Sequence, residues 1–176
     1  MKKTFFICLL LLLSVRVEAG DFIVNGGKLV WQGIFETNVG IDDLEGILIN
    51  SGKFTDIVNT GDRITFWCQR AHLDPRDFGY SIGSTPIYVS GNDISFFCTI
   101  QVKEGRYRAT VDQFVLTNNV TGGLLKEGDT ERIETYSVDR GGGLKSSFMK
   151  RPAELYDKFL IKLLTIEEAG YLSDDW

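Results

Sequence analysis

Residues 93–112 read DISFFCTIQVKEGRYRATVD, and this stretch decides how the rest of the chain is interpreted. In its first half, apolar and polar residues alternate with a period of two, which is typical of a strand with one buried face. Glu104 and Gly105 form a two-residue connection, after which the alternation resumes. Two such runs joined by a tight turn predict an antiparallel hairpin. On this pattern Phe96 faces a core, and Phe97 faces the opposite side of the sheet.

The residues ahead of this hairpin predict further strands. Residues 28–36 are rich in β-formers, and residues 57–70 carry a second run whose clearest part alternates. Residues 86–89 are short and open with a proline, which cannot donate to a ladder, so we expect an edge strand there. Residues 71–85 between the last two runs are a loop by composition, with an Asp-Pro pair and two glycines.

Two amphipathic helices are predicted, one on each side of this run of strands. Apolar residues recur at helical spacing over residues 41–48, acidic residues fill the first turns, and Gly52 supplies the stop. The second helix begins at Pro152, since proline favours a first turn, and its apolar stripe reaches Ile166 before Gly170 ends it.

The elements combine into an α+β fold. Residues 118–147 are a polar, glycine-containing connection, within which residues 131–138 are expected to extend as a peripheral strand. The alternation is typical of an antiparallel sheet that is covered on one side only. We therefore predict a single antiparallel sheet of about five strands, with the two helices packed on one face.

The N-terminus has the pattern of a secretory signal. Two lysines precede an apolar run over residues 5–13, and a Val-x-Ala pattern ends at Ala19. The run is too short for a membrane span, which takes about twenty apolar residues. We expect cleavage after Ala19, which leaves residues 20–176 as one domain with its core over about 28–168. The mature chain is then exported, periplasmic or secreted, with no transmembrane segment.

The charge balance bears on the partners of the protein. The chain has 19 basic and 24 acidic residues and a net charge of −5. Residues 1–19 hold three basic residues and one acidic residue, so their removal leaves 16 and 23 and a net charge of −7. Binding to nucleic acid normally rests on clustered lysine and arginine. We therefore expect no nucleic-acid partner.

Two cysteines remain after the leader, Cys68 and Cys98. Each alternates in phase with isoleucine and phenylalanine, so both are expected to face the core. An exported protein can carry a disulfide, and pairing of these two depends on the order of the strands. Buried thiols and one cross-strand disulfide both remain open on the sequence alone.

The order of elements, with WQGIF at residues 31–35 and IQVKEGRYR at residues 100–108, resembles a family of uncharacterised exported proteins of Bacteroidetes. That family is a domain of unknown function with a fold like the TATA-box-binding protein. The resemblance covers residues 28–168 and implies that the antiparallel sheet is curved. It implies no activity, and likeness to a DNA-binding fold does not transfer DNA binding. The chain departs from a minimal version in its long connection over residues 118–147.

No catalytic, metal or cofactor constellation is predicted. His72 is the one histidine, and it lies in a loop with Asp74 and Asp77, where a surface residue is the expected outcome. No Cys-x-x-Cys or His-x-x-x-His spacing offers a metal site. The triple glycine at residues 141–143 lacks the lysine of a phosphate loop and is expected to be a connector.

The side of the sheet without helices is the candidate binding surface, because exposed aromatic rings among polar groups suit a ligand or partner. The alternative is that residues 118–147 or the tail 171–176 cover these rings, or that they are ordinary surface aromatics. The leading hypothesis is a non-enzymatic binding domain for a protein, small-molecule or glycan ligand. Its rival is an envelope or carbohydrate hydrolase with carboxylate catalysis near Asp74 and Asp77. The predicted surface consists of Trp67, Phe97, Gln69, Thr99 and Arg108.

Overall fold

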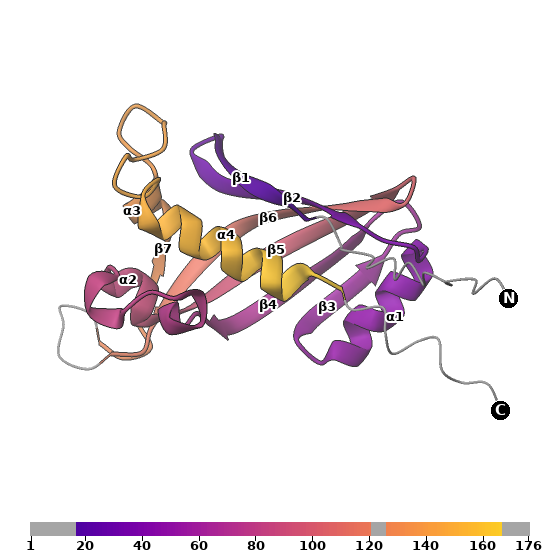
Figure 1. The fold of residues 1–176 in the computed structure, drawn as a ribbon, viewed down its shortest axis with the longest axis horizontal. Helices are drawn as coiled ribbons and strands as arrows, with labels where there is room; N and C mark the ends of the chain where they lie inside the picture. Colours follow the sequence, from indigo (N-terminus) through magenta and orange to yellow (C-terminus); the bar gives the residue numbers. More distant parts are fainter. Residues whose placement is uncertain (1–16, 121–125, 167–176) are drawn as a thin grey trace, which may run out of the picture.

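The computed structural model of the chain describes residues 17–120 and 126–166 (Figure 1). Seven strands, four α-helices and two short 3-10 turns make up the described part. In chain order these elements are β1 (Val17–Asn25), β2 (Lys28–Glu36), α1 (Ile41–Ser51), β3 (Phe54–Asn59), β4 (Ile64–His72), η1 (Pro75–Phe78), η2 (Ile82–Ser84), α2 (Ile87–Ser90), β5 (Asn92–Lys103), β6 (Arg106–Asn118), β7 (Thr130–Arg132), α3 (Glu134–Ser137) and α4 (Arg151–Leu164).

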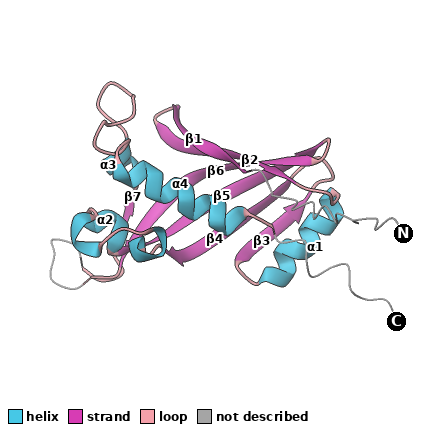
Figure 2. Cartoon of the chain, in the orientation of Figure 1, coloured by secondary structure: helices cyan, strands magenta, loops and turns pink. Residues whose placement is uncertain are grey.

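The strands form one antiparallel sheet, so the protein has the α+β architecture that the sequence predicts. The order across the sheet is β1-β2-β6-β5-β4-β3, and β7 pairs with β6 outside this path. Three of the neighbouring pairs, β1-β2, β3-β4 and β5-β6, are sequential hairpins. Figure 2 shows α4 lying across the strands, with α1 near β3. The sheet thus has seven strands where about five were expected.

The sheet is bent by bulges that sit inside its strands. The pairing shifts register in β3-β4, β4-β5 and β5-β6, and a non-glycine residue with a positive φ lies at each shift. These residues are Asp56 (54°), Arg70 (51°) and Gln113 (54°). A bulge inserts an extra residue into one strand, which bends that strand and increases its twist. The curvature implied by the family resemblance therefore has a local cause in three strands.

The core lies between the sheet and the helices α1 and α4. Phe96 is fully buried, and Phe97 on the same strand is half-buried, as the alternation of residues 93–102 predicts. Tyr107 fixes the end of α4, because its hydroxyl donates to the Leu164 carbonyl (2.7 Å) and accepts the Ile166 N–H (3.2 Å). The sheet and the two helices supply most of the buried residues, among them Leu29, Trp31, Phe35, Leu44, Leu48, Phe66, Phe114, Leu155, Phe159 and Leu160.

One cluster ties β1 and β2 to α4. The Trp31 indole N–H donates to Asp157 Oδ1 on α4 (2.8 Å), and the same oxygen accepts the Gly20 N–H (2.9 Å). The indole ring lies directly against two glycine backbones. A Cβ at Gly20 would come within 2.2 Å of the indole nitrogen, and one at Gly33 within 2.4 Å of the ring. Glycine at these two positions is therefore a packing requirement of the buried indole.

Several predicted elements are confirmed. The strand at residues 28–36, the first helix, and the hairpin built on residues 93–112 all occur as expected. The last helix starts at Arg151, one residue before the expected Pro152, and ends at Leu164. The predicted stop at Gly170 lies outside the described residues.

Other predicted elements are wrong in whole or in part. The alternating part of the run at residues 57–70 is confirmed as β4, but residues 57–59 belong to β3, because the chain turns between the two strands at Gly61, whose φ is 83°. Residues 86–89 contribute to helix α2 instead of a strand, and the Val89 N–H donates to the Pro86 carbonyl (2.9 Å). Residues 131–138 contain the end of β7 followed by α3, so only their beginning is extended.

Strand β1 is not predicted by the sequence pattern. It starts at Val17, ahead of the expected cut after Ala19, and brings Phe22 into the core, so the core begins before residue 28. The apolar run of the expected leader, residues 5–13, lies outside the described residues. Within the described ranges, no helix has both the length and the apolar character needed to cross a membrane.

Candidate functional site

The sheet face opposite Phe96, called here the open face, carries solvent-exposed apolar side chains. Val58 on β3 pairs with Thr65 on this face and is 53% exposed, and Ile34 on β2 pairs with Arg108 and is 37% exposed. Ile23 on β1 also lies on this face and is 45% exposed. Exposure of apolar side chains on three strands means that water reaches this side of the sheet, in contrast to the helix-covered side.

Trp67 and Phe97 form an aromatic pair near the middle of the open face. They are direct partners in the β4-β5 ladder, their ring centroids lie 5.3 Å apart, and their planes are tilted by 59°. This spacing is in the range favoured for interacting aromatic rings. Both side chains are half-buried. The two rings therefore hold each other in place while part of each remains accessible.

The pair belongs to a row of four side chains that runs across four strands. Thr55 on β3 pairs with Trp67, Trp67 with Phe97, and Phe97 with Asp112 on β6. We call these residues the aromatic row. Gln69 lies beside it and donates from Nε2 to Thr55 Oγ1 (3.3 Å).

The other predicted surface residues lie farther along the strands. Thr99 is half-buried and pairs with Thr65 and Thr110 in the next row. Arg108 pairs with Gln101, four residues along β5 from Phe97, which is about 13 Å at the usual rise of ~3.3 Å per residue. The structure therefore brings Trp67, Phe97, Gln69 and Thr99 together and sets Arg108 apart.

Arg108 lies at the hairpin end of the open face. Its Nη2 donates to Gln101 Oε1 (2.6 Å). It helps to line a shallow hollow of about 500 Å³ to which Ile34 and Arg106 also contribute. This hollow is a second feature of the same face, separated from the aromatic pair by the threonine row.

Asp112, at the β6 end of the aromatic row, is the feature that the predicted surface did not single out. Its Oδ1 is shielded from solvent and has no hydrogen-bond partner within residues 17–120 and 126–166. Buried polar atoms in folded proteins nearly always have a partner, and an unpaired carboxylate oxygen carries a desolvation penalty. Period-2 alternation placed Asp112 on the open face, but no sequence signal marks an unpaired oxygen.

Three arginines of the open face are engaged elsewhere. Arg63 pairs with Asp62 (2.9 Å), and the Arg108 contact to Gln101 is described above. Arg70 pairs with Asp93 (3.2 Å), and its Nη2 donates to Asn119 Oδ1 (2.9 Å). These three arginines thus have partners other than Asp112, and none of the ion pairs within the described residues includes Asp112.

The two cysteines lie on the covered face, and both are buried free thiols. In the β4-β5 ladder Cys98 pairs with Phe66 and Cys68 with Phe96, so the cysteines are diagonal neighbours and not direct partners. Burial raises the pKa of Cys68 to about 11, and burial also raises the pKa of Cys98. A nucleophilic cysteine needs a thiolate, and this environment opposes its formation.

The two aspartates named in the hydrolase hypothesis form ion pairs with different basic residues. Asp74 forms an ion pair with Arg76 (2.6 Å), whose hydrogen bonds lower the pKa of that carboxyl to about 2. Asp77 pairs with Lys162 on α4 (3.1 Å), and His72 Nδ1 lies 3.1 Å from Asp93 Oδ1. A general acid needs a raised pKa, which is the opposite of what Arg76 does to Asp74. Among the described residues no group of three candidate metal ligands comes together.

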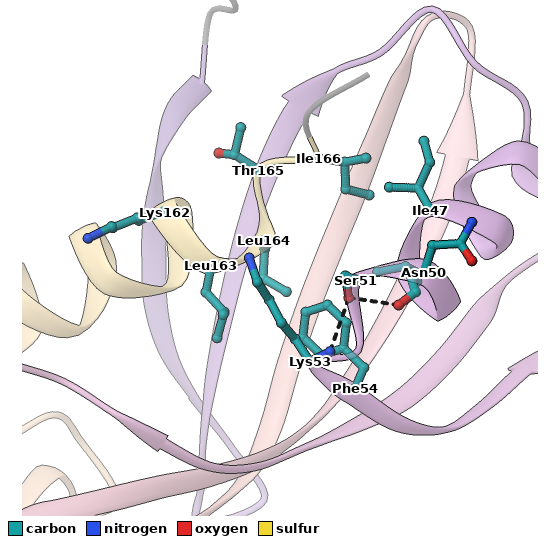
Figure 3. Close-up of a pocket in the computed structure, with 11 residues that line it drawn as sticks. Ile47, Asn50, Ser51, Lys53, Phe54, Lys162, Leu163, Leu164, Thr165 and Ile166 are labelled. Carbon is teal, nitrogen blue, oxygen red and sulfur yellow. Dashed lines mark hydrogen bonds between the residues drawn. The ribbon is translucent and has the colours of Figure 1, made fainter. Parts of the chain in front are cut away.

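A pocket of about 460 Å³ lies on the other side of the molecule, between the end of α1, the start of β3 and the end of α4 (Figure 3). Leu163, Leu164 and Ile166 line it from α4 and its exit, and Lys53 and Phe54 line it from β3 and the turn before it. Two helix C-termini meet here, and their partial negative charge favours a cation. Lys53 and Lys162 both line the pocket and supply this positive charge from the chain itself, and Lys162 also pairs with Asp77.

Comparison with known proteins gives likenesses of architecture only. No family model matches the chain, and no curated protein matches its sequence. The crystal structure of a TBP-like protein from Parabacteroides distasonis has 13% identity and a TM-score of 0.46, over 80% of this chain and 89% of that one. A DUF4468 family protein from Bacteroides ovatus has 12% identity and a TM-score of 0.45, over 79% and 83%. The first description names the TBP-like fold, and the second names a domain of unknown function, both from Bacteroidetes, as the resemblance in the sequence implies.

Proposed function

We propose that this chain is an exported, non-enzymatic binding domain whose ligand lies on the open face against Trp67 and Phe97. The observation that carries the proposal is the contact between these two half-buried rings, 5.3 Å apart, in the middle of a solvent-exposed sheet face. The signal pattern of residues 1–19 supports export and hence a location in the periplasm or outside the cell.

The arrangement of the rings suits binding energetics. Aromatic side chains supply much of the affinity of protein interfaces because they bury a large area with few rotatable bonds. Trp67 and Phe97 restrict each other, so less side-chain entropy is lost when a ligand covers them. The neighbouring Thr99, Thr110 and Gln69 offer hydrogen-bonding groups at the rim. Both a protein segment and a glycan ring can use such a surface.

The test is a binding screen of the chain that begins at Gly20. Fluorescently labelled protein is applied to peptide and glycan arrays as wild type, as Trp67→Ala and as Phe97→Ala. The matched control is Ile87→Ala, because Ile87 on α2 is 71% exposed and lies away from the aromatic row. We expect bound ligands to lose at least tenfold in affinity with either ring variant and to be unchanged in the control. Ligands that bind the ring variants as tightly as the wild type contradict the proposal.

The same protein preparation is used to test the alternative that the chain is a hydrolase. Wild type is incubated with glycan, peptide and ester substrates, and products are measured. We expect no turnover. Turnover that disappears in Asp74→Asn or Asp77→Asn would overturn the binding proposal in favour of carboxylate catalysis.

A further inference from the structure

The unpaired oxygen of Asp112 gives the open face a chemical preference. Asp112 is the direct ladder partner of Phe97, and opposite residues in an antiparallel pair have Cβ atoms about 4.5–5.5 Å apart. The carboxylate therefore lies beside the aromatic pair, with one oxygen buried and without a hydrogen-bond donor among the described residues. A cation is attracted both by a carboxylate and by the face of an aromatic ring, so the two side by side favour binding of a positively charged group.

Among the described residues, no ion pair includes Asp112 and no basic side chain donates to its Oδ1. Arg63, Arg70 and Arg108 are held by Asp62, by Asp93 and Asn119, and by Gln101, respectively. The carboxylate charge is therefore uncompensated, and because Asp112 as a whole is only half-buried, a group from outside the chain can meet this charge at the other carboxylate oxygen. The net charge of −5 adds a long-range attraction for a basic partner.

We propose that the ligand of the open face is a protein segment that places an arginine or lysine side chain on the aromatic row. This inference rests on the proposed function of that face. The charged end of that side chain donates to Asp112, and its aliphatic stem packs against Phe97 and Trp67. Lysine and arginine side chains have a long apolar stem and a charged tip, so they can make both contacts at once. A guanidinium also stacks on aromatic rings. A neutral glycan offers no such charge and is the competing occupant.

The experiment is an NMR titration of the isotope-labelled chain that begins at Gly20. The probes are N-acetyl-arginine amide and N-acetyl-citrulline amide, which have nearly the same shape but differ in charge. The indole resonance of Trp67, assigned by its absence from Trp67→Phe, reports binding. We expect a saturable shift with the arginine probe, at least tenfold weaker binding of the citrulline probe, and loss of the arginine preference in Asp112→Asn.

Asp21→Asn is the matched control. Asp21 is exposed and pairs with Gln32 on the same face, so its substitution removes one negative charge without touching the aromatic row. We expect the affinity of the arginine probe to change by less than twofold in this variant. An equal loss in both aspartate variants means that only net charge matters, and it overturns the proposal.

The remaining outcomes separate this inference from the proposed function. Equal binding of the two probes, or binding that survives Asp112→Asn but not Trp67→Ala, overturns the cation site and leaves the binding face standing. A saturable shift caused only by neutral glycans does the same and identifies the competing occupant. Urea unfolding supplies the structural control: we expect Asp112→Asn to be at least as stable as wild type, and strong destabilisation contradicts the inference, because it assigns Asp112 a structural role.

Discussion

The two described tryptophans lie on opposite faces of one sheet, and replacing each with alanine tests which face is the core. Trp31 has no exposed surface, and its indole N–H donates to Asp157 (2.8 Å). Trp67 is half-buried and packs on Phe97. The same substitution in the same sheet should therefore have very different consequences for the free energy of unfolding.

The size of each effect follows from burial. Replacing a fully buried tryptophan with alanine costs about 3–5 kcal/mol, because the lost transfer energy is joined by a cavity. Trp31→Ala belongs in this class. Trp67→Ala loses one aromatic contact, worth about 0.5–1.5 kcal/mol, and part of the burial of the ring. We expect about 1–2 kcal/mol for Trp67→Ala, so the two variants should differ by at least ~2 kcal/mol.

The assay is urea unfolding of the chain that begins at Gly20, followed by far-ultraviolet circular dichroism and fitted with a common m-value. For a domain of this size, 1 kcal/mol corresponds to a shift of about 2–4 °C in Tm. Thermal melts should therefore place Trp31→Ala lower than Trp67→Ala by roughly 4 °C or more. Equal destabilisation by the two substitutions refutes the reasoning, because it would mean that Trp67 is also part of a core.

Three further predictions concern the covered face. Asp157→Ala removes the acceptor shared by Gly20 and Trp31. It should lower the free energy of unfolding in urea by about 2–4 kcal/mol, since each hydrogen bond to a charged group contributes ~1.5–3 kcal/mol. Asp157→Asn keeps an acceptor and should lower this free energy by less than half as much. Thiol titration at pH 8 without reductant should detect almost no thiol in the native chain that begins at Gly20 and two per chain in denaturant, whereas a disulfide between Cys68 and Cys98 would give none in either. The free energy of unfolding should fall from about pH 9 to about pH 11, because burial raises the pKa of Cys68 to about 11 and the thiol therefore ionises first in the unfolded chain. Cys68→Ala should make this fall smaller. An unchanged pH profile in that variant would contradict the assignment.

The pattern of residues 93–112 was sufficient to predict the hairpin and its buried side, because a strand with one covered face has a strict period of two. The same reasoning failed at residues 86–89. Three of these four residues have high strand propensity, yet they contribute to a helical turn after Pro86, since that turn buries Val89 against the core. Tertiary burial of one side chain outweighed local propensity there.

Strand β1 was missed for a different reason. Its first residues, Val17 to Ala19, also form the small-residue pattern that predicts a cut site, so the sequence gives them a second interpretation. The packing of Gly20 on the Trp31 indole is visible only when the strands are placed side by side. Asp112 is a similar case, because the lack of a partner for Oδ1 depends on where every neighbouring side chain points.

The bends of the sheet and the candidate site occupy the same part of the molecule. Asp56 directly follows Thr55, and Gln113 directly follows Asp112, so two of the three bulge residues adjoin the two ends of the aromatic row. A non-glycine residue with positive φ is unfavourable by about 1–2 kcal/mol, and bulges recur where a side chain must be re-aimed. The bulges that bend the sheet thus also set the direction of the side chains at both ends of the aromatic row. Because the row is built on laddered strands and not on a loop, a ligand has to match a fixed surface, and the affinity should depend on the shape and charge of the ligand more than on rearrangement of the protein.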